Sequence, residues 1–128
     1  MCLIFDSNVF IYQLNNGLSE YGQALLKNGF TQGGGYSVIT RIEVLGFPQS
    51  QDDLDKAVRL FNGLNSININ PIIQETAITL RQARKIKVPD AIIAATALYL
   101  ELPLVTRNLD DFRWIKGLEL INPFPEAQ

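Results

Sequence analysis

The sequence predicts an α/β fold in which helices cover both faces of a mostly parallel central sheet. Short apolar runs alternate along the chain with longer stretches of helical periodicity, the pattern of parallel strands joined by helices. The chain has 128 residues, of which 47% are hydrophobic and 19% charged, so it can bury a core without disulfides. We expect residues 1–128 to form a single domain.

Apolar composition and turn residues place the expected elements. The expected strands are residues 2–5, 36–39, 67–69, 104–106 and 118–121. The expected helices are residues 8–14, 20–28, a helix opened by Thr40, and then residues 52–64, 71–85 and 91–100. Gly29 is expected to end the second helix, and residues 33–35 and 108–112 are expected to be loops.

The residue types that are missing exclude several kinds of chemistry. The chain has no histidine, which rules out serine–histidine and cysteine–histidine catalysis and histidine-rich zinc sites. Cys2 is the only cysteine, so no internal disulfide forms. No apolar run approaches the roughly 18 residues of a membrane span, and the first residues do not resemble a signal peptide. We therefore expect a cytoplasmic protein that does not enter a membrane.

Four acidic residues fall at boundaries of the expected elements. Asp6 follows the first strand, Glu43 lies in the first turn of the helix after the second strand, and Asp90 begins the alanine-rich helix. Asp111 lies in the loop after residues 104–106. Ligands of open parallel sheets gather beyond the carboxyl ends of the strands, so these carboxylates are expected to converge there. Oxygen ligands of this kind favour magnesium or manganese over zinc.

Each acid also has an ordinary structural explanation. Thr40 and Glu43 match a capping box, and Asp90 would complement a helix dipole. Asp6 would serve as a turn residue and N-cap, and Asp110–Asp111 as a solvated loop pair. These explanations do not account for the placement of all four acids at one edge of the expected sheet.

Basic and apolar side chains leave two further questions open. The net charge is −2, yet seven of the 11 basic residues are close together in the sequence: Arg81, Arg84, Lys85, Lys87, Arg107, Arg113 and Lys116. They either bind phosphates locally or form solvated helix faces. Five apolar residues either complete the core, which we favour for most of them, or form a binding groove: Leu14, Leu18, Tyr21, Leu25 and Phe47.

Several motifs together resemble those of PIN domains, most closely the VapC-type toxins. They are Asp6-Ser7-Asn8, Glu43 followed by Gly46, Pro89-Asp90-Ala91-Ile92-Ile93-Ala94-Ala95, and Thr106-Arg107-Asn108-Leu109-Asp110-Asp111-Phe112. The resemblance covers nearly the whole chain, and the last two motifs are the specific ones. It implies a PIN-like three-layer α/β/α fold.

The same resemblance implies an activity and a set of functional residues. The activity is that of an endoribonuclease dependent on Mg²⁺ or Mn²⁺, with Asp6, Glu43, Asp90 and Asp111 as metal-site residues. Asp111 fits the family position better than its neighbour Asp110. Asn8, Thr106 and Asn108 would be polar supports. It also implies an RNA substrate, a VapB-like antitoxin as partner, and a homodimer.

Other activities remain open at this stage. A non-catalytic RNA-binding PIN module or a structure-specific DNA nuclease would keep the same acids. A phosphoaspartate enzyme would also place an aspartate after the first strand. However, Asp6-Ser7-Asn8 lacks the second aspartate of haloacid-dehalogenase-type phosphatases. Hydrolysis by water would leave 5′-phosphate and 3′-hydroxyl ends, which distinguishes the favoured chemistry from attack by a 2′-hydroxyl.

Overall fold

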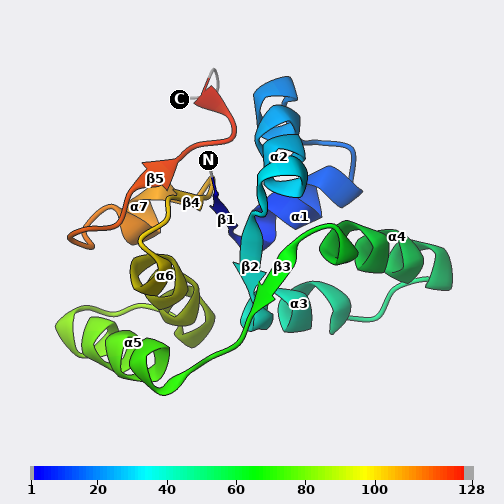
Figure 1. Ribbon diagram of the computed structural model, residues 1–128. Coiled ribbons are helices and arrows are strands. Elements are labelled where there is room, and N and C mark those ends of the chain that lie inside the picture. Colours follow the sequence, from blue (N-terminus) through cyan, green and yellow to red (C-terminus); the bar gives the residue numbers. More distant parts are fainter. Residues whose placement is uncertain (1, 126–128) are drawn as a thin grey trace.

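The computed structural model describes residues 2–125 and has a five-stranded parallel sheet at its centre (Figure 1). The strands lie in the order β3-β2-β1-β4-β5, and every neighbouring pair is parallel. Their bounds are β1 Ile4–Phe5, β2 Gly35–Ser37, β3 Asn65–Ile67, β4 Leu104–Val105 and β5 Leu120–Ile121. The chain moves outward from β1 to β3 and then crosses to the other side of β1, so the strand order reverses between β1 and β4.

Seven helices occur among the described residues. They are α1 Ser7–Leu14, α2 Glu20–Gln32, α3 Val38–Leu45, α4 Gln51–Asn62, α5 Pro71–Ala83, α6 Val88–Leu100 and α7 Leu109–Phe112. Side-chain caps begin several of them: Ser19 accepts from the Gly22 amide, and Asn70 accepts from the Ile73 amide. These caps satisfy amides that have no partner inside the helix. None of the helices in residues 2–125 is long and apolar enough to cross a membrane.

Alternate strand residues face two separate apolar cores, which gives the fold its three layers. Ile4 and Leu104 pack with residues of α5 and α6 on one face, whereas Phe5 and Val105 pack with α1, α2 and α4 on the other. The strands are therefore covered on both sides, as expected for parallel strands. The predicted α/β/α architecture is confirmed.

The structure differs from the expected elements in four places, and one strand of the sheet begins within the glycine run of residues 33–35. Gly29 does not end a helix, because α2 continues to Gln32 and is capped by Gly33 with a positive φ of 82°. Gly35 belongs to β2 and not to a loop. Residues 109–112 form α7, and the third strand is Asn65–Ile67, not 67–69.

The helix after β2 begins two residues earlier than expected. Its N-cap is Ser37, whose hydroxyl accepts from the Ile39 amide, so the prediction that Thr40 opens the helix is wrong. Thr40 is a buried residue within α3. Glu43 consequently lies beyond the first turn, and the capping-box explanation for it fails.

The five apolar residues with two possible roles divide between core and surface. Leu18 is buried, and Leu14 and Leu25 pack against the core that contains Phe5. Tyr21 and Phe47 are exposed. Core is therefore the correct reading for three of the five.

Candidate active site

The loop after β1 places Asp6 at the point where the strand order reverses. Asp6 is buried and serves as the N-cap of α1, where its Oδ1 accepts a hydrogen bond from the Ser7 amide at 2.7 Å. Its Oδ2 accepts from the Thr106 hydroxyl at 2.7 Å and from the Asn8 amide Nδ2 at 3.0 Å. Asp6 is thus both an N-cap and a carboxylate fixed at the crevice of the sheet, the usual ligand position in this architecture.

Burial makes the Asp6 carboxyl harder to ionise. Loss of hydration raises the pKa of Asp6 from 3.8 to about 6, against the hydrogen bonds from Thr106 and the Ser7 amide, which lower it. The negative charges of Asp90 and Glu43 contribute to this raised pKa. A carboxyl so placed gains from a nearby cation, because the cation offsets both the lost hydration and the repulsion.

Asp90 and Asp111 extend the acidic site along α6 and α7. Burial raises the pKa of the half-buried Asp90, and repulsion from Asp111 and Glu43 adds to this effect. The positive charge of Lys87 lowers it. Asp111 and Glu43 are exposed. The mutual influence of these charges places the four acids in one neighbourhood, although they come from four different helices or their caps.

Ser7 is a site residue that sequence reasoning missed. Its hydroxyl lies 2.7 Å from Oε1 of Glu43, to which it donates, and 3.1 Å from the hydroxyl of Thr40. Ser7 therefore joins the loop after β1 to α3 and holds the otherwise exposed Glu43 carboxylate. The contact joins residues 36 positions apart, so only its place in the Asp6-Ser7-Asn8 motif pointed to it.

The polar supports expected around Asp6 act in different ways. Thr106 and Asn8 donate directly to Asp6, and Asn8 also donates to the Thr106 hydroxyl at 3.3 Å. Asn108 contributes its backbone amide, which donates to the Thr106 hydroxyl at 3.0 Å. Within residues 2–125, no hydrogen bond joins the Asn108 side chain to Asp6 or Asp111. Asn108 therefore reaches the acidic site through Thr106.

The donor set suits a hard divalent cation that keeps part of its hydration shell. No three acidic side chains of the described residues enclose a common point for one ion, so the tight cluster expected from sequence is looser in the structure. Mg²⁺ in nucleotide-processing sites is typically held by one or two carboxylates, with water and substrate phosphate as its other ligands. Asp6 and Asp90 fit that arrangement, because the negative charge of Asp90 raises the pKa of Asp6 and a cation would offset this cost of ionising Asp6.

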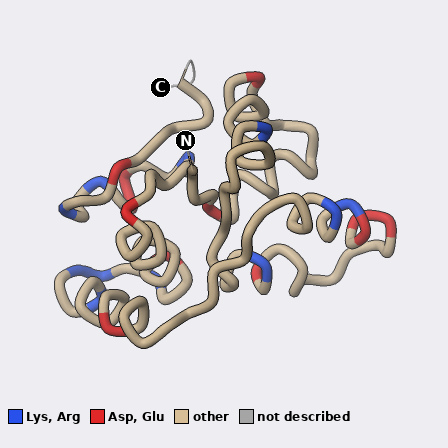
Figure 2. Tube along the Cα trace, viewed as in Figure 1, with Lys and Arg blue, Asp and Glu red and all other residues tan. Residues whose placement is uncertain are grey.

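A cavity of about 440 Å³, here called the basic cavity, opens beside these acids. Its lining includes Asp90 and Asp111 together with four of the predicted RNA-binding residues: Arg81, Arg84, Lys85 and Lys87. The guanidinium of Arg84 lies over the Trp114 ring at 5.0 Å. Figure 2 shows basic positions at the end of α5 and around α7, on the side of the molecule that also carries α6. Positive charge thus adjoins the acidic residues.

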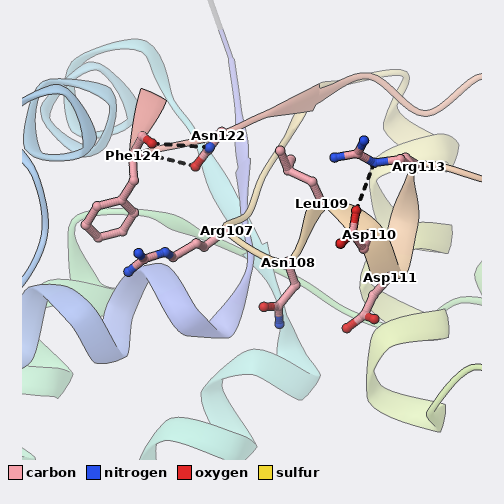
Figure 3. Close-up of a pocket in the computed structure, with 8 residues that line it drawn as sticks. All are labelled: Arg107, Asn108, Leu109, Asp110, Asp111, Arg113, Asn122 and Phe124. Carbon is pink, nitrogen blue, oxygen red and sulfur yellow. Dashed lines mark hydrogen bonds and ion pairs between the residues drawn. The ribbon is translucent and has the colours of Figure 1, made fainter. Parts of the chain in front are cut away.

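A second cavity of about 460 Å³, here called the loop cavity, is lined by residues of α7, of the loop after β4 and of the segment after β5 (Figure 3). Arg107 and Arg113, two further predicted RNA-binding residues, line it. Arg113 is ion-paired with Asp110 at 3.3 Å. Asp110 and Asp111 line both cavities. Lys116, the remaining candidate, is exposed and lines neither of these two cavities.

Comparison with protein families agrees with this geometry. Residues 3–118 match the family described as PIN domain. The chain belongs to the PIN domain family. A comparison with curated proteins gave no significant match. The resemblance to PIN domains seen in the sequence motifs is therefore confirmed.

Solved structures of PIN-fold chains from toxin–antitoxin complexes are similar over nearly their full length. One is a toxin–antitoxin complex from Klebsiella pneumoniae, 31% identical with a TM-score of 0.77, covering 94% of this chain and 97% of the other. Another is a DNA-bound VapBC from Salmonella typhimurium, 20% identical with a TM-score of 0.82, covering 96% and 98%. A third is VapBC-1 from nontypeable Haemophilus influenzae, 23% identical with a TM-score of 0.76, covering 96% and 98%.

Proposed function

We propose that this PIN domain chain is a VapC-like toxin, a metal-dependent endoribonuclease that hydrolyses RNA phosphodiester bonds. The observation that carries the proposal is the pairing of buried Asp6 with Asp90 at the β1/β4 crevice, next to a cavity lined by basic side chains. The acids favour a divalent cation and the basic cavity favours a polyanion. The family match and the likeness to chains of toxin–antitoxin complexes support the same activity.

Different residues of the chain would have different roles in hydrolysis. Asp6 and Asp90 would hold Mg²⁺ or Mn²⁺, with Asp111 and Glu43 acting directly or through water. When bound, such an ion lowers the pKa of a water molecule and neutralises charge on the phosphate. Thr106 and Asn8 hold the Asp6 carboxylate in place, and Ser7 holds Glu43. The basic cavity binds the RNA backbone on one side of the acids.

The biological setting is proposed from the same likeness. A toxin of this kind would act in the cytoplasm and be held inactive by a VapB-like antitoxin. We propose that it forms a homodimer, as VapC-type toxins commonly do. Residues 1–128 would then act as a single PIN domain in each subunit.

The test is to sequence RNA 5′ ends after expression of the wild-type protein and of Asp90→Asn. We expect new 5′-phosphate ends that disappear in Asp90→Asn and persist in Asp110→Asn, a matched change at an exposed, ion-paired aspartate. Purified wild-type protein should cleave single-stranded RNA with Mg²⁺ or Mn²⁺ and stop when EDTA is added. Cyclic phosphate ends, full activity of Asp90→Asn, or preferential cleavage of flap DNA would contradict the proposal.

A further inference from the structure

The loop cavity differs in chemistry from the basic cavity, although Asp110 and Asp111 line both. Its two basic side chains are already engaged, since Arg113 is ion-paired with Asp110 and Arg107 lies against aromatic rings. Its two acidic side chains balance them. A cavity without surplus positive charge is a poor phosphate site, so its ligand must be recognised by something other than charge.

The guanidinium of Arg107, stacked on the Phe124 ring, forms one wall of the loop cavity. The guanidinium of Arg107 lies 4.1 Å from the centre of the Phe124 ring and 5.1 Å from that of Tyr12. The two rings meet edge to face at 4.9 Å. Figure 3 shows the Arg107 side chain extended beside the Phe124 ring, away from Asp111. Arg107 is exposed and Phe124 half-buried, so both keep surface open to the cavity that they line.

Local hydrogen bonds fix the orientation of this surface. The Asn122 side chain accepts from the Phe124 amide at 2.9 Å and donates to the Phe124 carbonyl at 3.3 Å (Figure 3). These two bonds lie within the segment after β5 and fix its local backbone conformation. The Phe124 ring is thus positioned before any ligand arrives, which lowers the entropy lost on binding.

The same surface is connected to the acidic site. The Arg107 amide donates to Oδ1 of Asn8 at 3.4 Å, and Asn8 donates in turn to Asp6. Asp111 separates the loop cavity from the basic cavity while lining both. Because the two cavities share lining residues, a strand whose backbone lies in the basic cavity and passes over the acids would extend toward the loop cavity.

We propose that the loop cavity binds one unpaired nucleobase of the RNA strand, stacked on Phe124 and Arg107 beside the scissile phosphate. The proposal rests on the nuclease function proposed above and makes single-stranded RNA the substrate class. Unpaired bases are commonly bound by stacking on aromatic rings and on guanidinium planes. Nearby Asn108, which is exposed, supplies an amide that can donate to or accept from a base edge.

The test measures binding rather than cleavage, so that it stands apart from the test of the nuclease function. Fluorescence anisotropy in EDTA compares a labelled single-stranded RNA octamer of mixed sequence with an abasic octamer of equal length and charge. Wild-type protein should bind the base-bearing octamer about 5- to 160-fold more tightly, the range expected for base–aromatic stacking. Phe124→Leu keeps the apolar bulk of the side chain and should lose most of that difference, whereas Phe124→Trp should keep it.

Two controls separate stacking from charge and from loss of the fold. Phe47→Ala removes an exposed aromatic side chain that lines neither cavity and should leave both affinities unchanged. Lys85→Ala should weaken binding of both octamers equally. The proposal is overturned if wild-type protein binds both octamers equally, or if folded Phe124→Leu retains the preference for the base-bearing octamer.

Discussion

The Thr106 hydroxyl donates to Oδ2 of Asp6 across the seam between β4 and β1, at 2.7 Å. The strand register sets this contact, since Phe5 pairs with Val105 and the next residue of each strand follows directly. The hydroxyl also accepts from the Asn8 side chain and the Asn108 amide. One buried threonine therefore joins the loop after β4 to the start of α1 beside the proposed metal site.

Replacing Thr106 by valine should shift the acid limb of the nuclease pH profile to higher pH. The hydroxyl lowers the pKa of Asp6, so its loss raises that pKa above about 6. A hydrogen bond to a charged group contributes about 1.5–3 kcal/mol, or roughly one to two pH units. Cleavage should therefore fall more at pH 6.5 than at pH 8. Thr106→Ser keeps the hydroxyl and should retain the wild-type profile; an unshifted Thr106→Val profile would contradict the assignment.

Asp6 should make the metal-free protein less stable as the pH rises. Because its folded-state pKa is raised from 3.8 to about 6, the folded protein holds the proton more tightly than the unfolded chain. The stability from this group is complete below about pH 3.8 and is lost as the pH rises through 6, a change of about 3 kcal/mol. Asp6→Asn should remove this part of the pH dependence.

Urea unfolding in EDTA between pH 4 and pH 7.5 measures this effect. The free energy of unfolding of Asp6→Asn should fall less over that range than that of the wild-type protein. Asp110→Asn, at a side chain that is 94% exposed, should keep the wild-type slope. Parallel curves for wild type and Asp6→Asn would show that Asp6 is not a costly buried carboxylate.

Metal binding should distinguish Asp111 from its neighbour Asp110. Asp111 raises the pKa of Asp90, whereas Asp110 is paired with Arg113 on the surface. Asp111→Asn should therefore weaken Mn²⁺ binding by about 10-fold. It should also reduce the stabilisation of the folded protein by Mn²⁺ on heating, because that stabilisation depends on the ratio of ion concentration to dissociation constant. Asp110→Asn should change the Mn²⁺ affinity measured by calorimetry less than two-fold. If Asp110→Asn weakened Mn²⁺ binding more than Asp111→Asn, the fourth metal-site residue would be Asp110 and not Asp111.

Much of the site could be predicted because its acids sit at element boundaries. Asp6 follows a short buried strand and Asp90 begins an apolar helix, and both features are local in sequence. The parallel sheet was equally predictable from the alternation of apolar runs and helices. Glu43 was assigned to the wrong turn because Ser37 and Thr40 are both good N-caps, and only the register of β2 decides between them.

The remaining features depend on contacts between distant parts of the chain. Ser7 reaches Glu43 only because α1 packs against α3, and Phe124 reaches Arg107 only because β5 pairs with β4. Local periodicity carries no information about such pairs. The basic residues could be grouped by sequence, but not divided between two cavities of different charge.

Salt dependence should reveal which basic residues contact phosphate. Lys85→Ala removes a charge from the basic cavity and should reduce the slope of log affinity for RNA against log salt by about 0.7, the value for one single-strand phosphate contact. Lys116→Ala removes an exposed charge that lines neither cavity and should leave the slope unchanged. Equal slopes for all three proteins would mean that Lys85 belongs to a solvated helix face.

Gly29→Ala should destabilise the fold although it lies within a helix. Alanine in place of glycine normally favours a helix by about 1 kcal/mol. Here the added Cβ would lie 2.6 Å and 2.9 Å from two ring carbons of Phe5, which is fully buried, so we expect a net loss of about 1–3 kcal/mol in urea unfolding.

Phe5→Leu shortens the side chain that would clash, so the double variant should lose less than the sum of the single variants. Additive losses of unfolding free energy would show that the clash with Phe5 is not the cause. Because Phe5 directly precedes Asp6, displacement of its ring should also weaken Mn²⁺ binding in Gly29→Ala and not in the double variant.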